Sequence, residues 1–396
     1  MSSRSPDHRE WLEADGLGGF ASGTVSGTRT RRYHALLLTA TTPPTGRLVL
    51  VNGFDAWVET ANGLFPISSQ LYTPGVTHPG GADSIESFSH EPWPCWTFRL
   101  PDGTRIKQEI VVEHGTAVTS VTWRLMEPRD GVRLSLRPFL SGRDYHALHH
   151  ENPAFRFDAE VGRGRVTWHP YEQLPGIVSL FNGQYEHSPD WYRNFQYDEE
   201  RARGLDFVED LATPGVLRWS LSDGEAVWLL AADGSESALR GRGTAIGYAK
   251  QLRRRENQRR NTFASPLHRA ADAYVVRRQQ GKTIVAGYPW FTDWGRDTFI
   301  ALRGICLAAG RLDTAREILL EWAGTVSEGM LPNRFPDSGD APEFNAVDAS
   351  LWYIIAVHDY LAASKAAGQR IAPTDLRGLR AAVDKILSGY ARGTRY

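Results

Sequence analysis

Residues 96–125 read WTFRLPDGTRIKQEIVVEHGTAVTSVTWRL. Apolar and polar side chains alternate along three runs of this stretch, and short segments with turn-forming residues separate the runs. A period of two is typical of strands that bury one face, and Pro101-Asp102-Gly103 has the composition of a tight turn. The stretch therefore predicts a hairpin that continues into an antiparallel meander.

The same period of two extends over the chain up to about residue 255. Val132, Leu134 and Leu136 alternate with polar residues, and Gly, Pro, Asn and Asp punctuate the short apolar runs. Many short strands with turn residues between them are typical of packed antiparallel sheets. We expect residues 1–255 to form an N-terminal β-sandwich domain with its own core.

The pattern changes after residues 251–261, QLRRRENQRRN. We interpret this polar, mostly basic stretch as a solvated linker or the first helix face, in preference to an anion site. Apolar residues then recur at three- and four-residue steps, which is the period of helices. Over residues 262–396 we expect five helical segments, at 263–280, 297–309, 312–325, 346–364 and 374–390.

Two of these segments differ in how their apolar residues are distributed. The segment 312–325 has one apolar stripe, which predicts an outer helix buried on one side. Residues 347–363 are apolar almost all round, which predicts an inner helix buried on more than one side. Alternation of the two kinds indicates an (α/α) toroid, although a closed toroid needs more helices than these.

Composition excludes several classes of partner. Lys and Arg number 45 against 46 for Asp and Glu, so there is no broad field for nucleic acid or anionic lipid. The start of the chain has no apolar signal-peptide region, and the longest apolar stretch, about 226–232, is too short to span a bilayer. We expect no nucleic-acid partner and no membrane partner.

The side-chain inventory favours a neutral ligand in a reducing compartment. Cys95 and Cys306 have no metal-binding spacing, so we expect no metal site and a cytoplasmic location. The chain has 13 Trp and 14 Tyr residues, which provide many flat aromatic faces. Such faces can stack on the apolar C–H faces of sugars, although most of them are expected to pack in the core.

A glycine-rich motif near the N-terminus, Gly16 to Ala21, fits the dinucleotide pattern GxGxxA. That fingerprint requires a strand before it and a helix after it. Here the following residues, 22–30, add glycines and residues with hydroxyl or β-branched side chains, so no helix is predicted. We therefore expect no nucleotide cofactor.

A first candidate site lies in residues 287–297, GYPWFTDWGRD, directly before a predicted helix. In purely structural terms, Asp297 would cap that helix and Arg296 would pair with Asp293. A guanidinium, carboxylates and indole faces together also match the hydroxyls and the C–H face of a pyranose ring. We favour a sugar subsite made of Trp290, Asp293, Trp294, Arg296 and Asp297.

A second candidate site lies in the long segment 329–345 and the helix that follows it. Segments of this length without predicted secondary structure are often functional. We expect Asp348 to face a cavity from the first turn of the helix, with Trp352 one turn later, because an unpaired carboxylate in an apolar helix is costly. The polar residues of the segment are Asn333, Arg334, Asp337, Asp340, Glu343 and Asn345.

The two groups should meet in one pocket. In a ring of alternating inner and outer helices, every second helix begins at the same end. The segments that precede the second and the fourth predicted helix then open on the same face. This geometry predicts that Arg296 and Asp297 lie near Asn345 and Asp348.

Several of these motifs, in this order, resemble the prokaryotic glycogen debranching enzymes of the amylo-α-1,6-glucosidase type. The likeness runs from about residue 10 to at least 363. It implies an N-terminal antiparallel β-sandwich followed by an (α/α)6 barrel, which is incomplete over residues 262–396. The motifs are WLEADGLGGFASGTVSG (11–27), TRRYH (30–34), RDYH (143–146), residues 287–303 and FNAVDASLW (344–352).

The resemblance also implies an activity, the inverting hydrolysis of α-1,6-linked glucose at branch points of glycogen or limit dextrin. By that likeness, Arg296 and Asp297 hold the terminal glucose, and Asn345 and Asp348 form a second wall. The family's general acid is expected in a Thr-Trp-Met-Asp motif and its general base in a later segment; neither motif occurs before Tyr396. We therefore expect the catalytic carboxylates beyond Tyr396 and negligible glucosidase activity in this chain.

Two other functions fit the same residues. One is a glucoamylase-like glycosidase on the same helical toroid. The other is a non-catalytic glucan-binding protein that has only the sugar pocket. The glycine-rich opening, 16–27, favours the debranching family over the glucoamylase-like glycosidase. The missing acid and base favour the non-catalytic glucan-binding protein.

Overall fold

The computed structural model describes residues 7–233, 243–336 and 341–396, which divide into two compact units. Unit 1 extends to Asp15 and includes Gly19–Thr39 and Leu48–Thr262. Unit 2 consists of Gly16–Gly18, Ala40–Arg47 and Phe263–Tyr396. Two short segments from the first 47 residues thus belong to the second unit.

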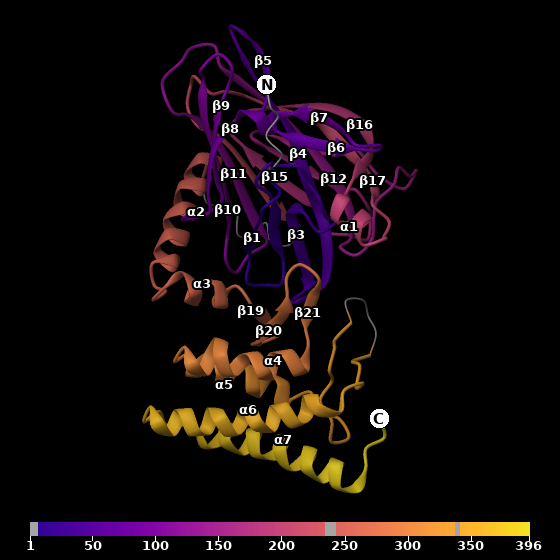
Figure 1. Cartoon of the computed structure of the whole chain (residues 1–396), viewed down its shortest axis with the longest axis vertical. Coiled ribbons are helices and arrows are strands. Elements are labelled where there is room, and N and C mark those ends of the chain that lie inside the picture. Colours follow the sequence, from indigo (N-terminus) through magenta and orange to yellow (C-terminus); the bar gives the residue numbers. More distant parts are fainter. Residues whose placement is uncertain (1–6, 234–242, 337–340) are drawn as a thin grey trace. The chain divides into compact units, whose positions relative to one another are not determined.

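The larger sheet of unit 1 has ten described strands in the order β1-β2-β3-β4-β12-β17-β16-β6-β7, with β5 paired to β4 (Figure 1). Its paired strands are antiparallel. The strands are β1 (Glu10–Ala14), β2 (Phe20–Thr24), β3 (Ala35–Thr42), β4 (Thr45–Thr60), β5 (Gly63–Pro66), β6 (Ser69–Tyr72), β7 (Val76–Gly80), β12 (Arg133–Asp144), β16 (Gln184–Gln196) and β17 (Val208–Ser220).

The second sheet has eight described strands in the order β13-β14-β15-β18-β11-β10-β9-β8. Ile106 pairs with Phe98 on one side and with Leu125 on the other, so the meander predicted over residues 96–125 is confirmed. The strands are β8 (Ile85–Ser89), β9 (Cys95–Arg99), β10 (Arg105–Val112), β11 (Val118–Leu125), β13 (Ala159–Gly162), β14 (Arg165–Trp168), β15 (Ile177–Phe181) and β18 (Ala226–Ala232).

The two sheets pack face to face around one apolar core. Trp123 of the second sheet lies 6.1 Å from Trp219 and 5.5 Å from Phe54 of the first, measured between ring centroids. The inward residues of both sheets belong to the same buried cluster. Each fully buried large apolar side chain contributes about 1.5–3 kcal/mol to the stability of the folded state. The predicted antiparallel β-sandwich is confirmed.

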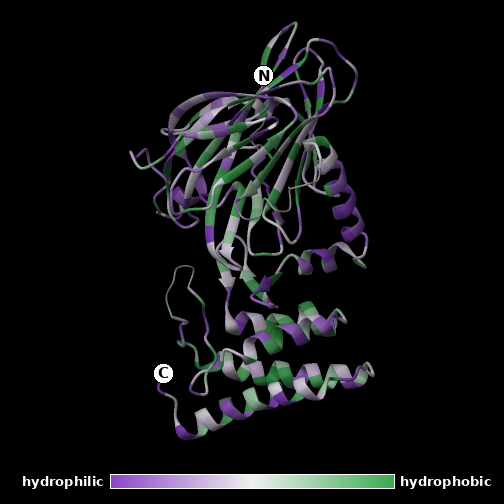
Figure 2. Ribbon diagram, turned by 180° about the vertical axis from the view of Figure 1, so that it is seen from behind, coloured by the Kyte–Doolittle hydropathy of each residue, from purple (hydrophilic) through white to green (hydrophobic). Residues whose placement is uncertain are grey.

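Helix α2 (Ala245–Arg260) covers the outer face of the second sheet. Thr244 caps it by accepting a hydrogen bond from the Gly247 N–H at 3.2 Å, and Leu252 packs among strand residues of that sheet. Figure 2 shows its mainly hydrophilic colouring. Of the two interpretations of this stretch, the helix face is confirmed and the linker is wrong, because most of the stretch lies within α2. Ion pairs such as Arg253 with Glu225 (2.7 Å) neutralise its charges. The boundary expected at residue 255 falls inside this helix.

Unit 2 begins with a short helix and a small antiparallel sheet. Ser265 caps α3 (Pro266–Asp272), which is followed by β19 (Val275–Arg278), β20 (Gly281–Gly287) and β21 (Phe291–Asp293). The helix expected over 263–280 is therefore wrong in its second half. The β-branched pair Val275-Val276 is buried and pairs with β20, and burial in a sheet overrides the helical spacing.

The four helical segments that follow the small sheet of unit 2 pack against one another (Figure 1). They pack around Phe299, whose ring lies 5.1 Å from both Trp322 and Tyr353 in edge-to-face geometry. The helices expected after residue 295 are all present with shifted ends. They are α4 (Gly295–Leu302), which continues as a π-helix over Arg303–Ala308, α5 (Leu312–Ala323), α6 (Val347–Ala366) and α7 (Pro373–Arg392).

The two helices with contrasting apolar patterns differ in outcome. Helix α5 buries a single stripe that includes Ala315, Ile318 and Trp322, as predicted for an outer helix. Helix α6 buries one face, but Val347 and Ile355 on the opposite face are 72% and 41% exposed. Burial on more than one side is thus not seen within the described residues. Although α6 is largely apolar, none of the described helices is long and apolar enough to cross a membrane.

Two minor elements complete the described secondary structure of unit 1. A 3-10 helix spans Gly81–Ser84 between β7 and β8. The short helix α1 (Asp198–Ala202) follows β16 and has three acidic residues in its first turn. Acidic side chains at this position interact favourably with the exposed N–H groups at a helix start.

Candidate functional site

The first candidate motif lies where β21 passes into α4. Trp294 occupies the N-cap position, and Arg296 and Asp297 follow in the first turn. Arg47, which is fully buried, donates from Nη1 to the carbonyl of Phe291 at 3.0 Å and so holds the approach to the helix. Asp297 is exposed in the first turn and is not the N-cap, so the structure does not show the capping role that was the alternative to a sugar contact.

Asp293 lies beneath this motif. Its carboxylate is fully buried and accepts a hydrogen bond from Nη1 of Arg278 at 2.7 Å. The Arg278 guanidinium lies 3.5 Å from the ring centroid of Phe335. Burial raises the pKa of Asp293, and the charge of Arg278 opposes that shift. Asp293 therefore supports the motif from below, which corrects its expected place among the sugar ligands.

Arg296 pairs with Asp348, not with Asp293. Its Nε lies 2.8 Å from Oδ2, and its Nη2 lies 2.7 Å from Oδ1, across a separation of 52 residues. The pair keeps the pKa of Asp348 below its usual range and raises the pKa of Arg296. The two side chains are 48% and 44% exposed, so both retain hydrogen-bonding capacity toward solvent.

Trp352 lies one turn after Asp348 on α6 and is half-buried. It lowers the pKa of Asp348 further, as a hydrogen-bond donor does to a carboxylate. A carboxyl with a lowered pKa remains ionised at neutral pH and cannot donate a proton there. The environment of Asp348 suits an acceptor of hydrogen bonds and does not suit a general acid.

The segment before α6 joins the same surface through backbone contacts. The carbonyl of Asn333 accepts a hydrogen bond from the Gly295 N–H at 2.9 Å, and Asn333 Nδ2 donates to Asn345 Oδ1 at 3.3 Å. The Arg334 guanidinium lies 5.7 Å from the Trp294 ring centroid. Asp337 and Asp340 lie outside the described residues.

Glu343, one of the polar residues of the second candidate site, is also part of this arrangement. Its Oε2 accepts from Asn345 Nδ2 at 3.1 Å, and its Oε1 lies 3.5 Å from Arg334 Nη1. Isolated bridges connect Arg334 both to Glu343 and to Trp294. Glu343 lies four residues before the start of α6, on the segment that carries Asn345.

The structure thus brings most of the expected residues to one surface of unit 2. Trp290, half-buried, lies in the turn between β20 and β21. The surface combines guanidinium donors, a carboxylate acceptor, side-chain amides and indole faces. The expected residues at this surface are Trp294, Arg296, Asp297, Arg334, Asn345, Asp348 and Trp352, and the largely buried Asn333 lies next to them.

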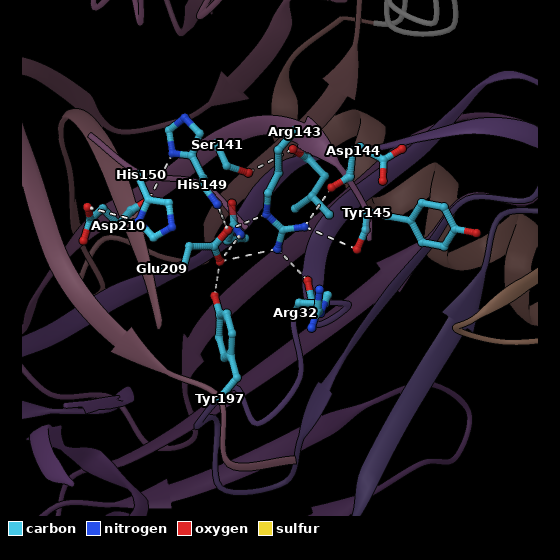
Figure 3. Close-up of polar contacts among 12 residues, drawn as sticks. Arg32, Ser141, Arg143, Asp144, Tyr145, His149, His150, Tyr197, Glu209 and Asp210 are labelled. Carbon is cyan, nitrogen blue, oxygen red and sulfur yellow. Dashed lines mark hydrogen bonds and ion pairs between the residues drawn. The ribbon is translucent and has the colours of Figure 1, made fainter. Parts of the chain in front are cut away.

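The motif RDYH at 143–146 belongs to a separate polar network inside unit 1 (Figure 3). Its centre is Glu209 of β17, which is fully buried and accepts hydrogen bonds from Arg143 and from the hydroxyl of Tyr197. The backbone N–H of His149 donates to the same carboxylate at 3.0 Å. Arg143 also donates from Nη2 to the carbonyl of Arg32 at 2.6 Å.

This network holds two motif segments together. Arg32 donates from Nη1 to the carbonyl of His146 at 2.6 Å, and the Tyr33 hydroxyl lies 3.1 Å from His146 Nδ1. TRRYH and RDYH are therefore neighbours although more than 100 residues separate them. Sequence reasoning missed Glu209 and Tyr197, because Glu209 is a single acidic residue in an otherwise ordinary strand and Tyr197 is a single residue between β16 and α1.

Known proteins match both parts of the chain. Residues 9–228 match the family model described as Glycogen debranching enzyme N terminal, and residues 269–396 match the one described as Amylo-alpha-1,6-glucosidase. The glycogen debranching enzyme of Saccharomyces cerevisiae is 42% identical over 105 residues. That match covers 25% of this chain and 7% of the yeast protein.

One solved structure that is similar to this chain is a bacterial glucoamylase complexed with acarbose. The two chains have 13% sequence identity and a TM-score of 0.45. That alignment covers 91% of this chain and 57% of the glucoamylase chain, so this chain spans little more than half of its length. The first family model alone spans more than half of this chain, and the second follows it in the expected order. The chain belongs to the glycogen debranching enzyme family.

Proposed function

We propose that the surface around Arg296 and Asp348 binds one glucosyl unit of a branched α-glucan, such as glycogen or limit dextrin. The observation that supports this most directly is the half-exposed, two-point contact between Arg296 and Asp348, with Trp352 one turn away on α6. A guanidinium and a carboxylate offer donors and acceptors side by side, which is the complement of two adjacent sugar hydroxyls. Indole faces suit the apolar side of the ring.

The proposal assigns substrate binding to nine residues and withdraws it from Asp293. Asp293 is fully buried against Arg278, so a sugar would have no access to its carboxylate. Trp290 and Asp297 are included because they lie in the same motif as Arg296. The nine are Trp290, Trp294, Arg296, Asp297, Asn333, Arg334, Asn345, Asp348 and Trp352.

We infer that the whole protein hydrolyses α-1,6-linked glucose at branch points, with unit 2 as part of an (α/α)6 glycosidase barrel. The two family matches support this inference. Unit 1 then corresponds to the N-terminal β-sandwich domain of this enzyme type. The two free cysteines, Cys95 and Cys306, favour a reducing, cytoplasmic setting.

Inverting hydrolysis requires a general acid and a general base on opposite sides of the sugar, about 6.5–9.5 Å apart. Asp348 does not suit the role of acid, because Arg296 lowers its pKa. We therefore assign Asp348 to binding and infer that the described residues supply neither the acid nor the base. The chain on its own should bind sugars and release no glucose at an appreciable rate.

The test is calorimetric titration of the chain with isomaltose, a disaccharide with an α-1,6 bond. Arg296→Ala should weaken binding by about 1.5–3 kcal/mol, the contribution of a hydrogen bond to a charged group. The matched control is Arg303→Ala, because Arg303 makes a similar ion pair with Asp359 on the same two helical segments, at 2.7 Å and 50% exposed.

The proposal predicts that Arg303→Ala keeps the affinity of the parent chain. Equal affinities for both variants and the parent would make Arg296 a surface ion-pair partner without a ligand. Rapid release of glucose from limit dextrin by this chain would contradict the placement of the acid and the base.

A further inference from the structure

A cavity lies inside unit 1, between its two sheets. Its volume is about 70 Å³, and residues of both sheets line it. Trp11, Trp96 and Phe98 form apolar walls, while Arg29, Asn52 and Ser68 bring polar groups. The cavity is separate from the Arg296 surface, which belongs entirely to unit 2.

Arg29 is the unusual member of this lining. Its side chain is only 6% exposed, and its guanidinium lies 4.9 Å from the Phe195 ring centroid and 5.8 Å from that of Phe139. Its Nε and Nη2 are buried and have no hydrogen-bond partner among the described residues. A buried guanidinium normally has acceptors, because leaving its N–H groups unpaired is costly.

The backbone beside Arg29 is shaped to admit this side chain. A Cβ atom on Gly53 would collide with Arg29 Nη1, so any larger residue at position 53 would displace the guanidinium. Aromatic rings, for their part, attract a cation but offer it no hydrogen-bond acceptor in the ring plane. The fold therefore holds Arg29 at the lining of the cavity and leaves its buried Nε and Nη2 without an acceptor among the described residues.

The cavity lining also includes a hydrogen-bond acceptor without a partner among the described residues, on Asn52. Asn52 Oδ1 is buried without a partner among the described residues, while its Nδ2 donates to Glu209 Oε2 at 3.4 Å. Because Nδ2 faces a carboxylate, the amide orientation is set, and Oδ1 remains an acceptor. A ligand that satisfies both groups must accept hydrogen bonds at Arg29 and donate one at Asn52.

The charges around the cavity favour a neutral ligand. Asp55, 6% exposed, is held by Gln70 Nε2 at 3.0 Å and by the Ser68 hydroxyl at 3.4 Å. Arg29 acts electrostatically on Asp55 and so is already partly balanced by this carboxyl group. An anion would add a negative charge beside Asp55, whereas a hydroxyl group both donates and accepts without adding charge.

We propose that this cavity is a second ligand site, which binds a small neutral polyol through Arg29 and Asn52. A volume of about 70 Å³ fits a glycerol-sized molecule or one edge of a hexose ring. The aromatic walls contact the C–H groups, and the guanidinium and the amide oxygen contact adjacent hydroxyls. The same chemistry could come from a free polyol or from the end of a glucan chain.

The experiment is saturation-transfer NMR on the full chain carrying Arg296→Ala, so that the site on unit 2 is weakened. The probes are glycerol, glucose and maltotriose, with chloride and inorganic phosphate as competitors. Adding Arg29→Met should lower the affinity for the bound polyol at least tenfold, because Met keeps an apolar stem and removes every donor. If the Arg296 surface binds no sugar, the comparison of the chains with and without Arg29→Met still tests the cavity, because those two chains differ only at position 29.

Each outcome decides the proposal. Binding of glucose or glycerol that depends on Arg29 supports it; equal binding of maltotriose identifies a glucan end, and its absence identifies a free polyol. Binding unchanged by Arg29→Met, displacement of the polyol by chloride or phosphate, or no binding of any probe overturns it. If Arg29→Met does not fold, a crystal of the parent chain soaked in glucose replaces it, and a cavity that contains only water contradicts the proposal.

Discussion

Arg278 and Asp293 form an ion pair that is almost completely removed from solvent, with 2.7 Å between Nη1 and Oδ2 and side-chain exposures of 7% and 0%. The pair joins β19 to β21, directly before Trp294 and α4. The Arg278 guanidinium also packs against Phe335 of the segment that carries Asn333 and Arg334. Both halves of the proposed glucose site thus rest on this buried pair.

Asp293→Ala should destabilise the chain strongly, because it leaves the Arg278 charge buried without its partner. The expected loss in the free energy of unfolding is about 3–5 kcal/mol. Urea denaturation of the parent and the variant measures it. The matched control is Asp348→Ala, which breaks an exposed pair and should cost less than about 1 kcal/mol. Similar losses of unfolding free energy in Asp293→Ala and Asp348→Ala would show that burial does not make the Arg278–Asp293 pair more important for stability than the Arg296–Asp348 pair.

Gly295→Ala should disturb the start of α4. A Cβ atom at this position would lie 2.7 Å from the carbonyl oxygen of Pro332 and 3.4 Å from the Trp322 ring. Because a backbone carbonyl cannot rotate away as a side chain can, the hydrogen bond from the Gly295 N–H to Asn333 should lengthen. We expect a lower melting temperature and weaker isomaltose binding than in the parent.

Calorimetry and a thermal melt test the Gly295 prediction together. Gly304→Ala is its control, because a Cβ atom on Gly304 meets no heavy atom within 4 Å. If Gly295→Ala and Gly304→Ala both melt and bind like the parent, the close approach of Pro332 is not a constraint on the site.

The buried carboxyl of Asp55 should make stability depend on pH. Burial raises the pKa of Asp55 to about 6, against the lowering effects of Gln70 and Arg29. Its folded pKa therefore lies above the unfolded value, about 3.9. As pH rises from about 4 to 6, the unfolded chain loses this proton first, so the contribution of Asp55 to stability falls.

Asp55→Asn removes this titration and can still accept hydrogen bonds from Gln70 and Ser68. The free energy of unfolding of the parent, measured relative to the variant, should fall by about 3 kcal/mol between pH 4 and pH 7, because a shift of one pKa unit corresponds to about 1.4 kcal/mol. Urea titrations at the two pH values give this difference. A difference between parent and variant that stays constant with pH contradicts the raised pKa.

Much of the fold follows from local patterns in the sequence. The alternation over residues 96–125 reports which side of each strand is buried, and Pro101-Asp102-Gly103 reports a turn, so β9, β10 and β11 are predictable. The single apolar stripe of α5 is predictable for the same reason. These features depend on residues a few positions apart, and that information is present in the chain itself.

Local patterns fail where burial in the folded chain overrides them. Residues 275–278 fit the spacing of a helix, but the sheet formed with β20 buries Val275 and Val276. The basic stretch 251–261 has the composition of a linker, yet most of it lies in α2, where carboxylates such as Glu225 neutralise its charges. Those carboxylates come from strands that are distant in the sequence.

The sequence by itself determined the family, the antiparallel strands and the residue types of the proposed glucose site, because motifs and periodicity are local. Only the tertiary structure decided which carboxylate meets Arg296. Asp293 is three residues away but is buried under Arg278, while Asp348 is 52 residues away and makes the contact. The physical reason is that packing decides which charged groups lie within contact distance, whatever their separation in the sequence. The unpaired Nε and Nη2 of Arg29 have the same origin, since only the folded core leaves them without an acceptor among the described residues.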